Sequence, residues 1–255
     1  MRVLLTNDDG FDAPGLRALY KIFKSSSSIS DVIVAAPEKQ MSCTGLSLTL
    51  HKPLRFIEVE ANYFKVNGSP ADCVCLVAGL IRREKIDMVV SGINEGPNLG
   101  NDVSYSGTVS AAIQATNMGI KAIAVSLSTW KADEELLTAS ANVALEWAKK
   151  FHSKNLPGQT FLNINIPAIK PDSAGKYKFH DPVVAKLGKR TYDYTLEERS
   201  DPRERPYYWN CGKPIGHCNQ KETDCSLLDE QKISVTPIKL DHTNYEAIEA
   251  LKDWK

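Results

Sequence analysis

Residues 3–10 read Val3-Leu4-Leu5-Thr6-Asn7-Asp8-Asp9-Gly10, a short apolar run that ends in a polar turn. Apolar residues at helical spacing follow at once, over residues 14–24. An apolar strand that ends in polar residues and passes directly into a helix is typical of a parallel α/β sheet. The stretch therefore predicts an α/β fold whose first strand delivers Asn7, Asp8 and Asp9 to the carboxyl edge of the sheet.

The same alternation of strand and helix continues through the first two thirds of the chain. Asp12 is placed to cap the first helix, and Ser69 followed by Pro70 marks the start of the second. Leu46, Leu48 and Leu50 alternate as in a strand. Further strands are predicted at 32–36, 87–90, 123–125 and 162–166, and further helices at 69–83, 108–118 and 133–150. We expect a Rossmann-like, mainly parallel sheet with helices on both faces, spanning residues 1–167 as the catalytic core.

The character of the sequence changes after residue 167. Residues 168–238 are rich in Pro, Gly, Tyr and charged side chains and contain no convincing helical pattern, while residues 245–254 fit a short helix. We expect residues 168–255 to form a β-rich C-terminal arm and tail. Trp254 in a terminal helix needs an apolar surface to cover it, which is consistent with a tail that packs on another subunit.

Composition excludes several classes of protein. The 255 residues include 31 Lys+Arg and 31 Asp+Glu, so the formal net charge is zero, and 42% of residues are hydrophobic. A disordered chain would have fewer apolar residues, and a general nucleic-acid binder would have a surplus of Lys and Arg. No apolar run has the length of a membrane span, and the N-terminal apolar run is too short for a signal peptide. We expect a cytoplasmic protein without nucleic-acid or membrane partners.

The cysteines near the C-terminus allow two interpretations. Cys211, Cys218 and Cys225 recur at intervals of seven, and His217 stands beside the second. These side chains are possible zinc ligands, but the Cys-x-x-Cys knuckle of most structural zinc sites is missing. A structural disulfide is the alternative and is less favoured still, because no signal peptide indicates a secretory context.

Oxygen-bearing side chains gather where the predicted strands end. Asp8 and Asp9 follow the first strand, Ser42 lies in the loop after the second, and Asn94 follows the strand at 87–90. Adjacent carboxylates raise each other's pKa unless a cation lies between them. Hard oxygen ligands from several loops suit Mg²⁺ or Mn²⁺. The alternative is an ordinary polar turn, for which the Asp-Gly pair at 9–10 is common.

A glycine-rich segment at 92–107 leads into the helix that starts near Ser106, Gly107 and Thr108. Free N–H groups at a helix N-terminus bind anions, and the two hydroxyls add donors. The segment matches neither Gly-x-Gly-x-x-Gly nor the Walker pattern. A metal site beside an anion site indicates phosphoester hydrolysis. The alternative is a loop in which Ser106 only caps the helix.

The chain resembles the SurE family, survival-protein phosphatases that act as 5′/3′-nucleotidases. The motifs that carry the resemblance are Asn7-Asp8-Asp9-Gly10, Gly68-Ser69-Pro70-Ala71-Asp72, Ser91-Gly92-Ile93-Asn94, Tyr105-Ser106-Gly107-Thr108, Leu162-Asn163-Ile164-Asn165-Ile166-Pro167, Asp201-Pro202-Arg203 and Ser234-Val235-Thr236-Pro237. They extend over nearly the whole chain. Two departures stand out: Cys43 follows Ser42 where the family commonly has glycine, and Glu204 interrupts the usual Asp-Pro-Arg-Gly.

The resemblance implies a metal-dependent phosphatase that hydrolyses nucleoside 5′- and 3′-monophosphates. The divalent cation, Mg²⁺ or Mn²⁺, would be held by Asp8, Asp9, Ser42 and Asn94. The catalytic residues would be Asp8, Asn94 and Ser106, and the phosphate would be bound by Asn7, Asn94, Ser106, Gly107 and Thr108. A homodimer or homotetramer with exchanged arm and tail is implied as well. Two alternatives stay open: an exopolyphosphatase or general phosphomonoesterase, and a non-enzymatic nucleotide-binding module.

Overall fold

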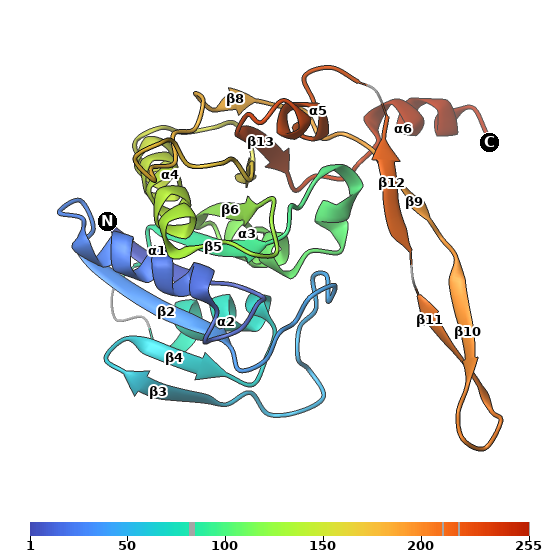
Figure 1. The fold of residues 1–255 in the computed structure, drawn as a ribbon, viewed down its shortest axis with the longest axis horizontal. Helices are drawn as coiled ribbons and strands as arrows, with labels where there is room; N and C mark the ends of the chain where they lie inside the picture. Colours follow the sequence, from blue (N-terminus) through green and yellow to red (C-terminus); the bar gives the residue numbers. More distant parts are fainter. Residues whose placement is uncertain (82–84, 211, 219, 255) are drawn as a thin grey trace.

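The computed structural model describes residues 1–81, 85–210, 212–218 and 220–254. Over these residues the fold is built on a nine-stranded sheet with the order β3-β4-β2-β1-β5-β6-β7-β13-β8 (Figure 1). The strands from β4 to β7 in this order run parallel, β3 and β13 are antiparallel to their neighbours β4 and β7, and β8 runs parallel to β13. Their bounds are β1 Arg2–Thr6, β2 Asp31–Pro37, β3 Phe56–Glu60, β4 Tyr63–Val66, β5 Met88–Glu95, β6 Lys121–Leu127, β7 Thr160–Ile166, β8 Val183–Val184 and β13 Ser234–Lys239. The mainly parallel α/β fold expected from the sequence is confirmed.

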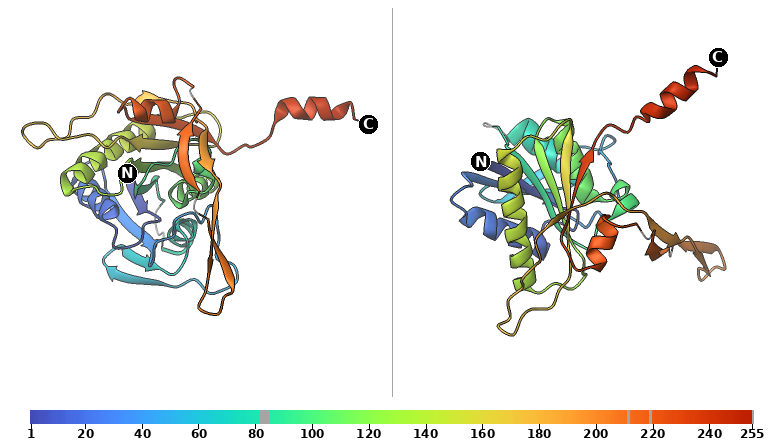
Figure 2. Two further views of the ribbon diagram at one scale, coloured as in Figure 1. Left: turned by 45° about the vertical axis from the view of Figure 1, so that its right-hand side comes forward. Right: turned by 90° about the horizontal axis from the view of Figure 1, so that it is seen from above.

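Helices cover both faces of this sheet. On one face α1 (Pro14–Ser25) packs against α4 (Glu134–Ser153), and the buried apolar side of α1 joins one hydrophobic cluster. On the other face α2 (Pro70–Leu76) packs against α3 (Gly107–Asn117) over a second cluster. The right-hand view of Figure 2, seen from above, shows the sheet between these layers. Because both faces are covered, the central strands are continuously apolar. Among the described residues, no helix is long and apolar enough to cross a membrane.

The sheet reverses its strand order between β1 and β5. From β1 the chain builds outward through β2 and β4, and it then returns to place β5 on the other side of β1. Connections on the two sides diverge at such a switch point, which leaves a crevice beyond the carboxyl ends of the strands. The residues after β1 and at the end of β5 therefore share one location.

A long two-part hairpin forms the arm and projects away from the sheet (Figure 1). Its root pairs β9 (Arg190–Asp193) with β12 (Lys213–His217), and its tip pairs β10 (Leu196–Ser200) with β11 (Pro206–Asn210). The last helix, α6 (Tyr245–Lys252), stands off from the body after β13 (Figure 2). None of its residues is buried in the single chain. The division of the chain at residue 167 stays a prediction, and β13 returns from the C-terminal part to pair with β7.

Several local predictions differ from the structure. The strand expected at 87–90 extends to Glu95 as β5 and therefore contains Asn94, which was expected to follow it. Leu46, Leu48 and Leu50 lie in an irregular loop, and the strands of this region are β3 and β4 instead. A short helix, α5 (Asp224–Asp229), occurs where no helix was expected, since six residues are too few for a periodic pattern. Ala13 rather than Asp12 is the N-cap of α1, and Asp12 pairs with Arg17 at 2.9 Å. The helix predicted over 69–83 is α-helical to Leu76 and continues as a π-helix, η1 (Val77–Ile81), while 82–84 lie outside the described residues.

Candidate functional site

A cavity of about 720 Å³ lies beyond the carboxyl ends of β1 and β5. Asp8, Ser42, Asn94 and Ser106, which the sequence places on four separate segments, all line it. The structure therefore brings together four of the predicted site residues in one hollow. The other predicted site residues do not line the cavity. Asn7 and Asp9 flank Asp8 in the chain, and Gly107 and Thr108 follow Ser106.

Asp8 is buried against the N-terminus of α3. Its Oδ1 accepts a hydrogen bond from the Thr108 hydroxyl, and Gly107 lies so close that an added Cβ would stand 2.7 Å from the Cβ of Asp8. Burial raises the pKa of Asp8, and the Thr108 hydroxyl and the backbone at Asp8, Thr108 and Gly107 act in the opposite direction. A helix N-terminus favours a nearby negative charge. The structure thus uses this helix end to support the buried carboxylate.

Asp9 is tied to the neighbouring strand. Its Oδ2 accepts a hydrogen bond of 3.1 Å from the backbone N–H of Glu95, the last residue of β5. Burial and the charge of Asp8 raise the pKa of Asp9 to about 6. Two adjacent carboxylates with raised pKa values are a pair that a bound cation would stabilise in the charged form.

Asn94 is positioned by an irregularity in β5. The register of β5 with β6 shifts between Ser91 and Asn94, which is the effect of a β-bulge that re-aims a side chain. The Asn94 Nδ2 donates a hydrogen bond of 2.6 Å to the carbonyl of Gly96. This bond uses the donor end of the amide and leaves the Oδ1 end as the possible ligand atom.

Ser42 lies on an exposed loop that is anchored to the site at both ends. The backbone N–H of Met41 donates to the Asp8 carbonyl at 2.7 Å, and that of Gly45 donates to the Tyr105 carbonyl at 3.0 Å. Between them Cys43 has φ of 57°, a left-handed conformation that glycine adopts at least cost. Glu204 in the arm has φ of 60°. Both positions are those at which this chain departs from a glycine common in the SurE pattern, so the backbone keeps the glycine-like turn.

Ser106 serves as the N-cap of α3. Its Oγ accepts a hydrogen bond of 3.1 Å from the Val109 N–H, which leaves the hydroxyl proton for another partner. Asn7 uses both ends of its amide to close the turn with Gly10, at 3.0 and 3.3 Å. The geometry therefore gives Asn7 and Thr108 positioning contacts inside the protein, and their predicted contact with phosphate stays a prediction.

Sequence reasoning expects base-recognising residues on loops between about Asn101 and Tyr105 or on the arm, but it identifies none of the residues that form this wall of the cavity. Arg190, Tyr192 and Tyr194 line the cavity from β9 and the residue after it, and Trp130 and Asp102 line it from core loops. The only signal in the sequence is the alternation Arg190-Thr191-Tyr192-Asp193-Tyr194, which places every second side chain on one face of a strand.

The donor set at the cavity fits a hard divalent cation. The Asp8 carboxylate, the Asn94 amide oxygen and the Ser42 hydroxyl line the cavity, and the Asp9 carboxylate is next to Asp8 in the chain. Such oxygen ligands are the ones that Mg²⁺ and Mn²⁺ accept. Within the described ranges there is no group of three or more His, Cys, Asp or Glu side chains that could hold a metal ion. The described residues therefore form no zinc site of this kind among the C-terminal cysteines. Cys225 is buried, His217 pairs with Asp229 at 2.6 Å, and Cys211 lies outside the described residues.

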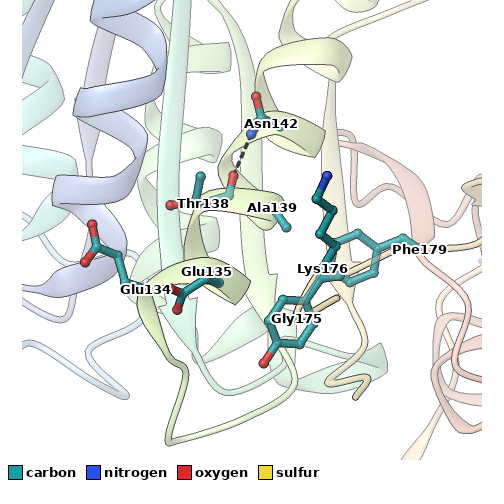
Figure 3. A pocket seen from close by; sticks show the side chains of 9 residues that line it. Glu134, Glu135, Thr138, Ala139, Asn142, Gly175, Lys176 and Phe179 are labelled. Atoms are coloured by element: carbon teal, nitrogen blue, oxygen red, sulfur yellow. Dashed lines mark hydrogen bonds between the residues drawn. The ribbon is translucent and has the colours of Figure 1, made fainter. Parts of the chain in front are cut away.

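A second hollow lies between α4 and the loop at 175–179 (Figure 3). Figure 3 shows Glu134 and Glu135 at one end and Lys176 and Phe179 at the other. None of the predicted site residues lines it. It shares no lining residue with the cavity that Asp8 and Asn94 line.

A family model described as Survival protein SurE matches residues 3–194. The chain belongs to the SurE family. A relative from Geotalea uraniireducens (strain Rf4) named 5′-nucleotidase SurE is 44% identical over 254 residues, covering 100% of this chain and 99% of the relative. A relative of the same name from Carboxydothermus hydrogenoformans is 39% identical over 259 residues, covering 100% and 96%.

The fold agrees with the SurE family over the full chain. A crystal structure of the SurE protein from Aquifex aeolicus superposes with a TM-score of 0.83 at 36% identity and covers 100% of this chain and 99% of that one. The resemblance recognised in the sequence motifs is therefore confirmed. The enzyme class expected from it, phosphoric monoester hydrolases, is confirmed at the level of the SurE family.

Proposed function

We propose that this SurE protein is a metal-dependent phosphatase that hydrolyses nucleoside 5′- and 3′-monophosphates to nucleoside and phosphate. The observation that carries the proposal is the meeting of Asp8, Asn94 and Ser106 in one cavity at the switch point of the sheet. The name 5′-nucleotidase SurE, which relatives bear over their full length, supports the choice of substrate class.

The proposed roles follow from the contacts of each residue. Asp8 and Asp9, with Ser42 and Asn94, would hold Mg²⁺ or Mn²⁺. A bound cation would offset the burial and the mutual repulsion that raise the pKa values of the two carboxylates. When bound, that cation would supply a Lewis acid for the phosphoryl group and for the attacking water. The Ser106 hydroxyl, which has a proton to donate beyond its capping bond, would bind a phosphoryl oxygen. The first turn of α3 at Gly107 and Thr108 would add the positive end of its dipole.

The cavity favours a nucleotide over a polyphosphate. Among the described residues that line it, Arg190 is the one Lys or Arg side chain, and it is paired with Asp102. A polyanionic chain would need several free cations along its path, whereas one phosphate needs only the local metal and helix end. Tyr105, Trp130 and Tyr194 expose large rings at the cavity, which suits a ligand with an aromatic base.

A substrate panel tests this choice. Release of inorganic phosphate is measured with 5′-AMP, 3′-AMP, phenyl phosphate and polyphosphate at matched concentration, with Mn²⁺ or with chelator. The proposal expects the highest kcat/KM for the two nucleotides and loss of activity with chelator. A preference for polyphosphate would support the exopolyphosphatase alternative, and binding of nucleotides without turnover would support the non-enzymatic module.

We propose further that the protein forms a homodimer or homotetramer in which arm and tail are exchanged. Helix α6 buries no residue within its own chain, its apolar side chains Tyr245, Ile248 and Leu251 are exposed, and so is Trp254 just after the helix. Apolar helix faces of this kind are covered in stable proteins. Sedimentation equilibrium of the full chain tests the assembly: a dimer or tetramer is expected, and a monomer that persists at micromolar concentration contradicts it.

A further inference from the structure

The root of the arm presents a row of side chains to the cavity. Arg190 and Tyr192 belong to β9 and Tyr194 follows it, at positions spaced by two. Residues spaced by two point to the same side of an extended chain, and all three line the cavity that Asp8, Asn94 and Ser106 line from the core. The row therefore forms part of the wall of the candidate active site.

Contacts with the core fix this row in place. The Arg190 guanidinium pairs with the Asp102 carboxylate, and the Tyr192 hydroxyl donates to the same oxygen, Oδ2, at 2.6 Å. The backbone N–H of Arg190 donates to Oδ1 of Asn101 at 2.7 Å. Asp102 lies in the 3-10 turn η2 (Gly100–Ser104), which leads directly to Tyr105 and Ser106. These contacts therefore hold the root of the arm at a defined place relative to Ser106, the proposed phosphate-binding residue at the phosphate end of the cavity.

A second carboxylate, which is buried, also connects the root of the arm to the core. Asp224, the first residue of α5, accepts hydrogen bonds from the Gly100 N–H at 2.8 Å and from the Gly188 N–H at 2.7 Å. Gly100 begins η2, and Gly188 lies two residues before β9. One side chain therefore connects the loop of the active site to the start of the arm.

Tyr194 differs from Arg190 and Tyr192, which are bonded to Asp102, because its side chain lies mostly in solvent. Its side chain is 79% exposed, and its contact within the row is a tilted one with the Tyr192 ring at a centroid distance of 6.2 Å. An exposed aromatic ring beside a polar catalytic cavity offers a stacking surface to a ligand. A nucleobase is an aromatic group of matching size, and the substrate phosphate would be bound in the same cavity.

We infer that Arg190, Tyr192 and Tyr194 form the nucleoside subsite of this enzyme, with Tyr194 stacking on the base. The inference rests on the proposed nucleotidase function and names the part of the chain that recognises the nucleoside. Asp102 and Asp224 are positioning residues that hold the subsite over the phosphate end. Because every base has a π-face, stacking on tyrosine tolerates all of them. The subsite therefore predicts broad use of the common nucleoside monophosphates.

Steady-state kinetics of Tyr194→Ala on two substrates tests the inference. The substrates are 5′-AMP and ribose 5-phosphate, which shares the phosphoester and the sugar but has no aromatic ring to stack on Tyr194. The inference predicts a rise of about fivefold or more in KM for 5′-AMP, the lower end for loss of a base-stacking ring, with little change in kcat. The KM for ribose 5-phosphate changes much less, because this substrate has no base to lose from the stack, and Tyr194→Phe keeps the wild-type KM because the ring remains.

Tyr208→Ala is the matched control, since Tyr208 is an exposed tyrosine of the same arm that does not line the cavity. It is expected to leave both substrates unaffected. An unchanged KM for 5′-AMP in Tyr194→Ala overturns the inference, and so does an equal loss for both substrates. Failure of the proposed function is distinct, because the wild-type protein with Mn²⁺ would then release phosphate from neither substrate.

Discussion

The backbone N–H of Glu95 donates a hydrogen bond of 3.1 Å to Oδ2 of Asp9, and this bond joins β5 to the turn after β1 where the sheet reverses its strand order. The bond fixes the direction of the Asp9 carboxylate without neutralising it. Burial and the adjacent charge of Asp8 raise the pKa of Asp9 to about 6. The end of the sheet therefore carries an electrostatic cost that a divalent cation would relieve.

Replacement of Asp9 by asparagine is expected to stabilise the metal-free protein near neutral pH. The pKa of Asp9 in the folded protein, about 6, lies above its ordinary value of 3.8. The charged carboxylate therefore lowers stability above about pH 6, and this cost disappears as the pH falls from about 6 to about 4. Solvent reaches the side chain, so we expect a gain of about 1–2 kcal/mol for Asp9→Asn rather than the full shift of about 3. Calorimetry with chelator at about pH 7 should show a melting temperature about 2–6 °C higher.

Added Mn²⁺ should reverse the order of these two proteins. The wild-type protein gains stability from the ion, because its two carboxylates become paired with a cation. Asp9→Asn gains less, since one ligand charge is missing. An unchanged melting temperature for the variant with chelator, or an equal Mn²⁺ shift in both proteins, would contradict the assignment of Asp9.

The Thr108 hydroxyl, which is bonded to Asp8, is expected to matter for turnover. Thr108→Val keeps the shape of the side chain but removes the donor to a buried carboxylate. A hydrogen bond to a charged group contributes about 1.5–3 kcal/mol, so kcat/KM should fall about tenfold or more. Thr108→Ser restores the hydroxyl and should recover most of the activity.

Thr116→Val serves as the control for this change. Thr116 lies on the same helix, and its hydroxyl donates to the carbonyl of Ala112 at 2.8 Å, away from Asp8. Its loss should alter kcat/KM less than about twofold, within the usual range for a hydrogen bond internal to a helix. Equal losses in Thr108→Val and Thr116→Val would indicate a general effect on α3 rather than support of Asp8.

Asp224 is expected to be important for both stability and substrate binding. Asp224→Asn replaces one acceptor oxygen by an NH₂ group that must face a backbone N–H, of Gly100 or of Gly188 and Cys225. An unsatisfied buried donor pair costs about 1–3 kcal/mol, and the melting temperature should fall accordingly. In the folded variant the KM for 5′-AMP should rise more than that for ribose 5-phosphate. Glu230→Gln, an exposed change just after the same helix, should do neither. A variant with wild-type melting temperature and KM would disprove the role.

The strand–helix alternation explains how much of the site could be predicted from the sequence. Asp8 comes just after an apolar strand, Asn94 lies near the end of one, and Ser106 caps a helix, so parallel topology alone places them at one edge. The arm residues could not be predicted in this way. Arg190 meets Asp102 across 88 positions of sequence, through a hairpin whose exposed strands carry no hydrophobic pattern. The bonds of Asp224 to Gly100 and Gly188 could not be predicted either, because α5 is too short to give a periodic signal.

The ion pair at the base of the arm should make its attachment sensitive to pH. The hydrogen bond with Asp229 and that with the Cys218 carbonyl raise the pKa of His217 above 6.5, while burial and Arg190 oppose the shift. The pair therefore contributes stability below about pH 6.5 and loses it as the pH rises through the raised pKa. NMR titration should give His217 a pKa above 6.5 in the wild-type protein and a lower one in Asp229→Asn. Equal values in the two proteins would show that the pair does not form in solution.

Phosphate release from 5′-AMP by the wild-type protein and by Asp8→Asn, each with Mn²⁺ and with chelator, tests the central claim most directly. Asparagine has the size of aspartate and can still accept the hydrogen bond from the Thr108 hydroxyl, so we expect the variant to fold. Its melting temperature verifies this. We predict that the wild-type protein releases phosphate with Mn²⁺ and not with chelator, and that Asp8→Asn releases none in either condition. Full activity in folded Asp8→Asn, or wild-type activity that is indifferent to chelator, would contradict the account.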